Sequence, residues 1–271
     1  MGSNRIEYPG NHWIRSGEPQ KALQAYLEQQ SKTYSKIKNA YVRELLGSLK
    51  DKDFLDYGCG AGMFLVYGAK QGASRIVGIE AEKAVLKTAA YFMETEGFKD
   101  RCELIHAEHW PCFPEDRKFD VILLKDVIEH VKEDDLLLER ASKSLKPGGF
   151  IVLSTQNSFS LNYLLEGSWE YFFRKNKNWR GWDLTHFRFY RPGTITKKFK
   201  KAGLHPVEWR SAYIIPYKFP PFSRAGKAYI RLDFLGHIDR IFGRIPPFCL
   251  MGWNTIVKGV AVNRSSRTMN P

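Results

Sequence analysis

The sequence lacks the features that mark secreted, membrane-spanning and fibrous proteins. It has four cysteines, which form neither a C-x-x-C pair nor an evenly spaced framework, so we expect reduced thiols and a cytoplasmic protein. It has no run of about 18 apolar residues that could cross a membrane, and no low-complexity tract or internal repeat. Hydrophobic residues make up 43% of the chain, which is enough for a globular core.

Acidic residues are scarce in the C-terminal third. From residue 174 onward the chain has 20 Lys and Arg but only 4 Asp and Glu, whereas the first 173 residues have 22 basic and 25 acidic residues. A strongly positive region favours an anionic partner. A phosphorylated substrate, an anionic membrane surface and nucleic acid are open alternatives, as is a charged face that meets only solvent.

Short apolar runs alternate with helical patterns in the middle of the chain. The runs lie at residues 54–57, 76–79, 103–105, 119–124 and 150–153, and the helical patterns at 62–71, 82–96 and 133–145. Such alternation predicts an α/β fold with a parallel sheet and helices on both faces. Lys-Pro-Gly-Gly at 146–149 predicts a tight turn before the fifth strand, because proline ends a helix and glycine lets the chain reverse.

The segments on either side of this core are predicted to belong to the same domain. Residues 1–50 predict a helical cap, with apolar residues at helical spacing over 19–47 and a break at 31–33. Residues 51–155 are expected to form the core of the sheet, and residues 156–271 are expected to supply its last strands and a segment that covers one end of the core.

The C-terminal segment contains an unusually long connection, residues 214–252. It joins predicted strands at 206–213 and 255–262, the first of which follows a predicted helix at 194–202. Proline pairs bracket a basic, amphipathic helical stretch within the connection. One face of this stretch is apolar and consists of Ala228, Leu232, Leu235, Ile238 and Phe242.

A glycine-rich turn follows the first predicted strand. Asp56 ends the strand, and Gly58, Gly60 and Gly62 follow at alternate positions before a helix. Glycines let the backbone approach a ligand closely, and the helix start offers unpaired N–H groups. The spacing differs from the G-x-G-x-x-G that cradles pyrophosphate in dinucleotide enzymes. A carboxylate before the turn suits the ammonium end of a methionine moiety better than a phosphate.

Glu80 ends the second predicted strand, 18 residues after Gly62. A carboxylate at this point can accept hydrogen bonds from both hydroxyls of a ribose, and it would repel a 2′-phosphate. Together with Asp56 and the Lys-Pro-Gly-Gly segment, Glu80 predicts S-adenosyl-L-methionine as the cofactor.

The run from about Asp53 to Thr155 resembles the class I S-adenosylmethionine-dependent methyltransferases, in particular the branch containing the ubiquinone-biosynthesis O-methyltransferases. The resemblance implies a Rossmann-like fold with a seven-stranded, mostly parallel sheet. It also implies that Gly58 packs against the amino-acid moiety of the cofactor and that Glu80 holds the ribose. The backbone at Lys125 would contact the cofactor near its sulfonium, and Lys38 would meet its carboxylate.

One motif departs from this family. Its members commonly have an Asp before Ala-Glu after the third strand, which hydrogen-bonds the adenine amino group. Here the residues are His106, Ala107 and Glu108. The resemblance implies that this loop binds adenine, and it leaves open whether His106 makes the bond or Glu108 and backbone groups do.

Three polar side chains after the fourth predicted strand are candidates for acceptor chemistry. If Asp126, Glu129 and His130 are helical, their i, i+3 and i+4 spacing places them on one face. They could bind a divalent cation such as Mg²⁺, which lowers the pKa of a hydroxyl, or Asp126 and His130 could act directly, with His130 as base. The run resembles the family's E-x-x-E-H, which implies a metal; the alternative is that Glu129 and His130 only cap and pack the loop.

His186 is a second candidate, in a Thr-His-x-Arg-Phe segment similar to one that lies over the acceptor in this branch of methyltransferases. It would be a base or a substrate contact, or else a hydrogen-bonded loop histidine. Nearby aromatic residues are expected to line or cover the acceptor pocket: Trp169, Tyr171, Phe172, Phe173, Trp179 and Trp182.

These patterns favour a methyltransferase that acts on a small-molecule, lipid-like acceptor, most readily on oxygen. The basic connection at 214–252 would rest on an anionic membrane surface or shield the pocket. Two alternatives remain: an RNA methyltransferase that uses the basic C-terminal third, and a protein that binds S-adenosylmethionine without catalysis.

Overall fold

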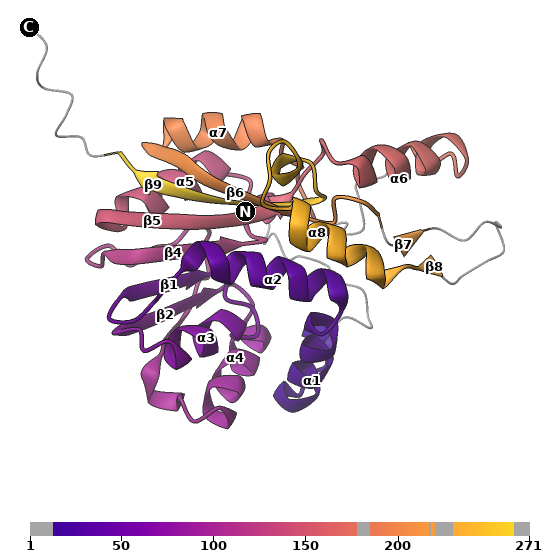
Figure 1. The fold of residues 1–271 in the computed structure, drawn as a ribbon. Coiled ribbons are helices and arrows are strands. Elements are labelled where there is room, and N and C mark those ends of the chain that lie inside the picture. The colour runs from indigo at the N-terminus through magenta and orange to yellow at the C-terminus, as the bar shows by residue number, and fades with distance from the viewer. Residues whose placement is uncertain (1–12, 178–184, 217, 220–229, 263–271) are drawn as a thin grey trace, which may run out of the picture.

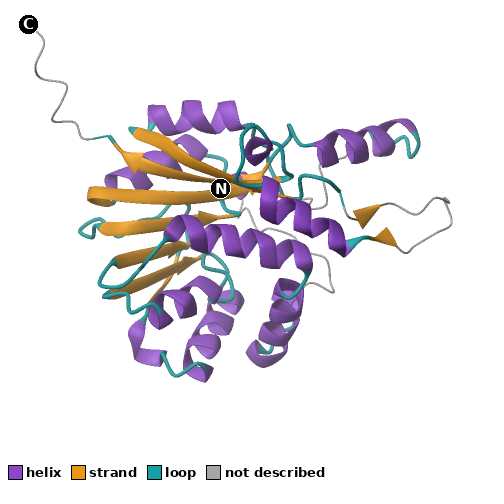
Figure 2. Cartoon of the chain, viewed as in Figure 1, coloured by secondary structure: helices purple, strands orange, loops and turns teal. Residues whose placement is uncertain are grey.

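The computed structural model describes residues 13–177, 185–216, 218–219 and 230–262. Seven strands form one sheet in the order β3-β2-β1-β4-β5-β9-β6 (Figures 1 and 2). β9 runs antiparallel to the other six strands of this sheet, which share one direction. The strands are β1 (Asp53–Tyr57), β2 (Arg75–Glu80), β3 (Glu103–His106), β4 (Phe119–Lys125), β5 (Leu145–Gln156), β6 (Leu204–Ala212) and β9 (Asn254–Ala261). This confirms the predicted, mostly parallel seven-stranded sheet.

Helices cover both faces of the sheet (Figure 1). Helices α2, α3 and α4 pack on one face, with α1 against α4, while α5 and α7 pack on the other. The helices are α1 (Pro19–Gln30), α2 (Thr33–Leu46), α3 (Met63–Lys70), α4 (Lys83–Thr95), α5 (Asp134–Lys143), α6 (Leu161–Phe172), α7 (Pro192–Lys201) and α8 (Gly236–Phe242). The predicted break at 31–33 is confirmed, because α1 ends at Gln30 and α2 begins at Thr33.

The apolar runs of the central strands are explained by burial on both faces of the sheet. Successive side chains of a strand point to opposite faces. Phe54 and Leu123 belong to the core beneath α2, α3 and α4, whereas Leu55 and Leu124 belong to the core beneath α5 and α7. All four side chains are fully buried, as is typical of parallel sheets.

The predicted tight turn at 146–149 is wrong. Strand β5 begins before it, since Leu145 pairs with Phe119 and the pairing resumes at Phe150, opposite Val121. The segment between them bulges out and returns to the same strand. It stays close to β4, because a Cβ on Gly149 would lie 3.0 Å from the carbonyl oxygen of Phe119.

The connection between β6 and β9 contains a shorter helix than the sequence pattern predicts. Helix α8 has seven residues, because a two-stranded ribbon of β7 (Lys218–Phe219) and β8 (Ile230–Arg231) and a 3₁₀ turn precede it. The proline pair at 220–221 and Ala228 lie outside the described residues. No helix in the described part of the chain combines the length and apolar character that a membrane crossing requires.

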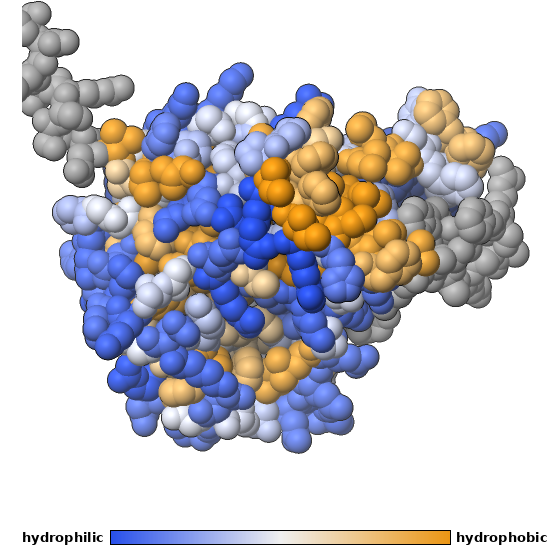
Figure 3. Space-filling view, in the orientation of Figure 1, coloured by the Kyte–Doolittle hydropathy of each residue, from blue (hydrophilic) through white to orange (hydrophobic). Residues whose placement is uncertain are grey.

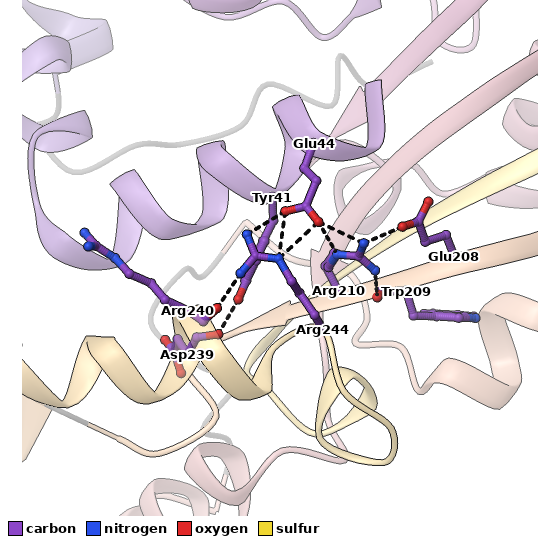
Figure 4. Close-up of polar contacts among 8 residues, drawn as sticks. All are labelled: Tyr41, Glu44, Glu208, Trp209, Arg210, Asp239, Arg240 and Arg244. Atoms are coloured by element: carbon purple, nitrogen blue, oxygen red, sulfur yellow. Dashed lines mark hydrogen bonds and ion pairs between the residues drawn. The ribbon is translucent and has the colours of Figure 1, made fainter. Parts of the chain in front are cut away.

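Polar contacts fix this connection to α2 and to β6 (Figure 4). The buried Asp239 accepts hydrogen bonds from the N–H groups of Tyr213 (2.6 Å) and Ile214 (2.8 Å) just after β6. Glu44 of α2 pairs with Arg210 of β6 at 2.9 Å and with Arg244, after α8, at 2.7 Å. The N-terminal helices and the C-terminal connection are therefore joined on one side of the sheet.

Candidate active site

The carboxyl ends of the parallel strands bring four predicted site residues to one edge of the sheet. Asp56, Glu80, His106 and Lys125 lie at or next to the ends of β1, β2, β3 and β4. Glu80 pairs directly with His106 in the β2–β3 register. Ligands of open α/β sheets bind at this edge, where the strand order reverses. In this sheet the reversal lies between β1 and β4.

The glycine loop after β1 has the backbone conformation that its sequence requires. Gly58, Gly60 and Gly62 have φ of +75°, +54° and +86°, a region that favours glycine. A Cβ on Gly58 would lie 2.5 Å from Cγ2 of Val127, so Gly58 also packs against the segment after β4. A Cβ on Gly60 would meet no described atom within 4 Å, which leaves space for a ligand beside the loop.

Glu80 is held beside the glycine loop by backbone donors. Its Oε2 accepts a hydrogen bond from Gly60 N–H at 3.0 Å, and its Oε1 accepts from Ala81 at 2.8 Å and Glu82 at 3.2 Å. Burial raises the pKa of Glu80, while these hydrogen bonds lower it in part. The carboxylate is therefore fixed in position next to the loop.

The environment of the Asp56 carboxylate shows whether this edge of the sheet can accept the ammonium group of a methionine moiety. It is 2% exposed, and burial raises its pKa to about 7 against the opposing charge of Lys125. Within the described residues, no side-chain hydrogen bond or ion pair engages its carboxylate. Burying an acid without a partner is costly, and a ligand ammonium group would remove that cost. The residues present therefore fit S-adenosylmethionine.

The loop after β3 lies at the same edge. His106 Nε2 is 2.8 Å from the carbonyl oxygen of Ala81, so Nε2 carries the proton. Ala107 N–H donates to the carbonyl oxygen of Glu80 at 2.9 Å. The Glu108 side chain is 69% exposed, with an oxygen 3.9 Å from His106 Nδ1. His106 thus lies beside Glu80, where the sequence places the adenine loop, and its hydrogen bond to adenine stays a prediction.

The predicted common helix face of Asp126, Glu129 and His130 is wrong. Asp126 has φ of +56°, and its N–H donates a hydrogen bond to the carbonyl oxygen of Ser154 at 3.0 Å. This bond continues the pairing with β5, so Asp126 lies before the start of any helix. A 3₁₀ turn covers only Ile128–His130. The Asp126 side chain consequently joins a different set of residues from its two predicted partners.

Asp126 is surrounded by hydrogen-bond donors. Its Oδ2 lies 2.5 Å from Lys38 Nζ and 3.2 Å from Lys125 Nζ, and its Oδ1 accepts from Ser154 (2.9 Å) and Asn254 (3.3 Å). Burial alone would raise the pKa of Asp126, but the two lysines outweigh burial and hold it well below its usual range. Such an acid is a poor proton acceptor near neutral pH.

His186 joins Glu129 and His130 to form a polar cluster. The rings of His130 and His186 are 4.8 Å apart between centroids, and the potential ligand atoms of the three residues lie within 4.8 Å of one another. Glu129 is fully buried and accepts a hydrogen bond from Thr155 at 2.9 Å. Burial, followed by the charge of Asp126, raises the pKa of Glu129. The two candidate histidines, 56 residues apart in sequence, thus meet in the structure.

The aromatic neighbours of His186 differ from those expected. Phe189 lies 5.7 Å from the His186 ring, and Tyr163 and Trp253 complete the group at 5.3 and 5.9 Å from Phe189. The side chain of Phe172 is 70% exposed. Tyr171 and Phe172 instead border a surface pocket of about 290 Å³ beside Tyr163 and Leu164. Phe173 is exposed and stacks on Trp169, and Trp179 and Trp182 lie outside the described residues.

Several residues of the site were missed by the sequence patterns. Ser154 and Thr155 come at the end of the fifth predicted strand, so their position at the ligand edge was a usable signal. Asn254 and Trp253 reach the site from the start of β9, the antiparallel strand beside β5. Nothing local in the sequence marks them.

The family is identified by comparison with known proteins. Residues 26–208 match a family model described as a methyltransferase domain. The chain belongs to the S-adenosylmethionine-dependent methyltransferases. It is 31% identical over 128 residues to a ubiquinone biosynthesis O-methyltransferase of Pelagibacter ubique, covering 47% of this chain and 52% of that protein. It is 30% identical over 164 residues to the protein of that name from Thiobacillus denitrificans, covering 59% and 67%.

The match thus spans about half of the Pelagibacter relative's length. Among solved structures, magnesium protoporphyrin IX methyltransferase from Synechocystis, with bound S-adenosylhomocysteine, is similar at a TM-score of 0.56 and 14% identity. The similarity covers 96% of this chain and 90% of that one. At such identity it shows the fold alone, and it confirms the Rossmann-like methyltransferase fold expected from the sequence.

Proposed function

We propose that this methyltransferase transfers the methyl group of S-adenosylmethionine to an oxygen atom of a small-molecule acceptor. One observation supports the proposal most directly: two groups of residues lie at the same edge of the sheet. The glycine loop and Glu80 can hold a cofactor, and the His130–His186 pair can accept a proton. The names of the relatives, O-methyltransferases of ubiquinone biosynthesis, support oxygen as the acceptor atom.

The cofactor would be held by residues from four elements. Glu80 accepts hydrogen bonds from the ribose, and the loop at 106–108 contacts adenine. Asp56 faces the ammonium group of the methionine moiety, and Lys38 its carboxylate. The glycine loop allows the ligand to approach the backbone because Gly60 borders open space.

The chain's own part in the transfer is alignment and proton removal. When bound, the cofactor supplies a methyl group made electrophilic by the adjacent sulfonium. The chain would have to hold the acceptor oxygen in line with the methyl carbon, so that the new oxygen–carbon bond would form as the carbon–sulfur bond breaks and the leaving sulfur keeps the electron pair. His130 or His186 takes the hydroxyl proton of the acceptor. Phe189 and Trp253 place apolar surface beside these histidines, which favours an apolar acceptor.

The test combines substrate discovery with histidine variants. Purified protein and methyl-labelled cofactor are incubated with lipid, small-molecule and RNA fractions of a cell extract. We expect label in a small-molecule or lipid fraction, and a rate lower by about 100- to 10,000-fold for the variant that lacks the base, His130→Ala or His186→Ala. Binding of S-adenosylhomocysteine should be unchanged. If both variants retain full activity, the proton acceptor lies elsewhere. If wild-type protein binds cofactor but labels no fraction, the chain binds S-adenosylmethionine without catalysis.

We also propose that the same cluster binds a divalent cation. The grouping of Glu129, His130 and His186 supports this proposal. A set of two imidazoles and one carboxylate suits zinc or a similar transition metal better than Mg²⁺, which prefers oxygen ligands. The cation would lower the pKa of the acceptor hydroxyl. Activity that disappears in a chelator and returns with added metal would support this proposal. Activity unaffected by chelator would leave direct proton transfer to a histidine.

We further propose that the acceptor is lipid-like and that the protein meets it at an anionic membrane surface. Large apolar side chains are exposed on two segments beside the acceptor side of the sheet, and Figure 3 shows such side chains gathered next to strongly hydrophilic ones. On and around α6 they are Phe159, Leu161, Leu164, Leu165, Tyr171, Phe172 and Phe173; around α8 they are Phe234, Ile241, Phe242, Ile245 and Phe248. Apolar side chains among many basic residues are typical of membrane-surface binding.

Sedimentation with liposomes tests this surface. We expect binding to vesicles that contain anionic lipid, weaker binding as salt is raised, and little binding to neutral vesicles. Tight binding to RNA without binding to vesicles would instead favour the RNA methyltransferase alternative.

A further inference from the structure

The two chain segments that contain the candidate histidines are joined by contacts beyond the histidine rings themselves. One segment, residues 128–134, begins with the 3₁₀ turn that contains His130; the other, residues 185–190, contains His186. The structure describes residues 185–189 and places them in no helix or strand. The position of His186 relative to His130 therefore depends on individual contacts between the two segments rather than on a regular hydrogen-bonding pattern.

Tyr190 connects the second segment to both ends of the first. Its hydroxyl donates a hydrogen bond to Oδ2 of Asp134 at 2.7 Å and lies 3.1 Å from the carbonyl oxygen of Ile128. Ile128 is the first residue of the turn that contains His130, and Asp134 is the first residue of α5. Burial, followed by the hydrogen bond to Asp134, raises the pKa of Tyr190, so its hydroxyl remains a donor.

Arg188 reinforces the same connection. One of its guanidinium nitrogens lies 2.9 Å from Oδ2 of Asp134, and another donates a hydrogen bond to the carbonyl oxygen of Lys132 at 2.9 Å. Asp134 is 4% exposed, and Lys198 of α7 lies 2.9 Å from its other oxygen. Burying a carboxylate is costly unless cations pair with it. These two cations therefore stabilise Asp134 where Tyr190 contacts it.

The residues on either side of His186 also contact the first segment. Phe187 N–H donates a hydrogen bond to the carbonyl oxygen of Glu129 at 2.9 Å, and Thr185 Oγ1 lies 3.1 Å from His130 Nδ1. His186 comes between these two contacts in the sequence, and its ring centroid is 4.8 Å from that of His130. A displacement of the second segment along the first would therefore move one histidine ring relative to the other.

We propose that Tyr190 and Arg188, which both contact Asp134, are positioning residues that hold His186 beside His130. This inference rests on the proposed function, in which one of the two histidines takes the proton of the acceptor. A base must lie within hydrogen-bond reach of the proton that it removes, and a displacement of about 1 Å can lower the rate of a reaction about 100-fold. Tyr190 and Arg188 act through the histidines and do not take up the proton themselves.

Nuclear magnetic resonance of protein with labelled histidine tests this inference without an acceptor. The measurement is the nuclear Overhauser effect between the His130 and His186 rings, which requires their close approach; His130→Ala and His186→Ala assign the signals. We expect the effect in wild-type protein and its loss in Tyr190→Phe, which removes only the hydroxyl. Tyr41→Phe is the matched control. It removes an equally buried hydroxyl, which donates to the carbonyl oxygen of Asp239, and it should keep the effect.

Label transfer from the cofactor measures the consequence for the reaction. Each variant is incubated with methyl-labelled S-adenosylmethionine and the extract fraction that wild-type protein labels. We expect the rate to fall about 10- to 100-fold in Tyr190→Phe, because the base is displaced from the acceptor. Affinity for S-adenosylhomocysteine should not change. Tyr41→Phe should transfer label at the wild-type rate.

The outcomes separate this inference from the proposed function. An Overhauser effect as strong in Tyr190→Phe as in wild type overturns the inference, and so does an equal loss in Tyr41→Phe, its absence from wild-type protein, or an unchanged rate of label transfer. If wild-type protein labels no fraction, the proposed function fails, while the Overhauser effect still shows whether Tyr190 positions the histidines. Should Tyr190→Phe fail to fold in a thermal melt, Arg188→Met, at a side chain that is 38% exposed, provides the same comparison.

Discussion

The proposed cofactor site and the proposed acceptor site of this protein differ in how the chain assembles them. On the cofactor side, Asp56, Glu80 and His106 come one after another from the ends of successive strands, and the charge of the first 173 residues is nearly balanced. On the acceptor side, His130 and His186 come from separate loops, and the last third of the chain is strongly basic. The proposed cofactor site therefore uses a local geometry that repeats from strand to strand, whereas the proposed acceptor site combines residues that are distant in the sequence.

The largest expected effect on the proposed cofactor site comes from a substitution at Gly58. We expect Gly58→Ala to weaken cofactor binding by about 100-fold or more, because φ is +75° and the new Cβ would lie 2.5 Å from Val127 Cγ2. Calorimetry with S-adenosylhomocysteine measures the loss. Gly148→Ala is a matched control with φ of +77° and no described atom within 4 Å of its Cβ. It should lower stability without changing cofactor affinity, and normal binding by Gly58→Ala would show that the loop does not set the site.

The acceptor side is tested by removing apolar surface from α6. Leu164 and Leu165 are 55% and 54% exposed. If both enter the membrane surface in part, Leu164→Ser with Leu165→Ser should weaken vesicle binding by about thirtyfold, the effect of roughly 2 kcal/mol of lost apolar burial. Cofactor affinity should stay unchanged. Vesicle binding equal to wild type in a sedimentation assay would remove α6 from the membrane-facing surface.

The cofactor side should respond to pH through Asp56. Burial raises its pKa to about 7, and a ligand ammonium group favours the ionised form. Affinity for S-adenosylhomocysteine should therefore be highest above pH 7 and fall below it, to about one tenth at pH 6 of its value at pH 8. In Asp56→Asn the affinity should be lower and nearly independent of pH over this range. A pH profile that survives in Asp56→Asn would assign the titration to another group, such as Glu80.

The smallest expected effect is on the ion pairs of Glu44, which connect α2 to the C-terminal part of the chain. Glu44→Gln weakens the ion pairs to Arg210 and Arg244 that tie the C-terminal connection to α2. These side chains are partly exposed and screened by solvent, so we expect a loss of about 1 kcal/mol in unfolding free energy. Denaturant unfolding measures it, with Glu139→Gln as a control that should leave stability unchanged. If stability does not change in Glu44→Gln, the connection is held mainly by Asp239.

Much of the fold was predictable because the central strands are buried on both faces. That burial requires apolar runs such as 119–124, and these runs are visible without a structure. The turn predicted at 146–149 is wrong, since proline and glycine favour a turn and a bulge alike, and only the pairing of Leu145 with Phe119 distinguishes them. The helical position predicted for Asp126 is wrong for a similar reason: its N–H donates a hydrogen bond to Ser154 of β5, a contact between neighbouring segments that helical spacing does not reveal.

The residues of the proposed cofactor site can be predicted from local sequence patterns, because a parallel sheet brings the carboxyl ends of its strands to one edge. Asp56, the three glycines, Glu80 and the loop at 106–108 could be recognised for that reason. Local patterns do not show that His186 joins Glu129 and His130, or that Asp126 contacts Lys38 and Lys125; tertiary packing brings these side chains together. These contacts span tens of residues, and they depend on how loops pack between strands rather than on any local pattern.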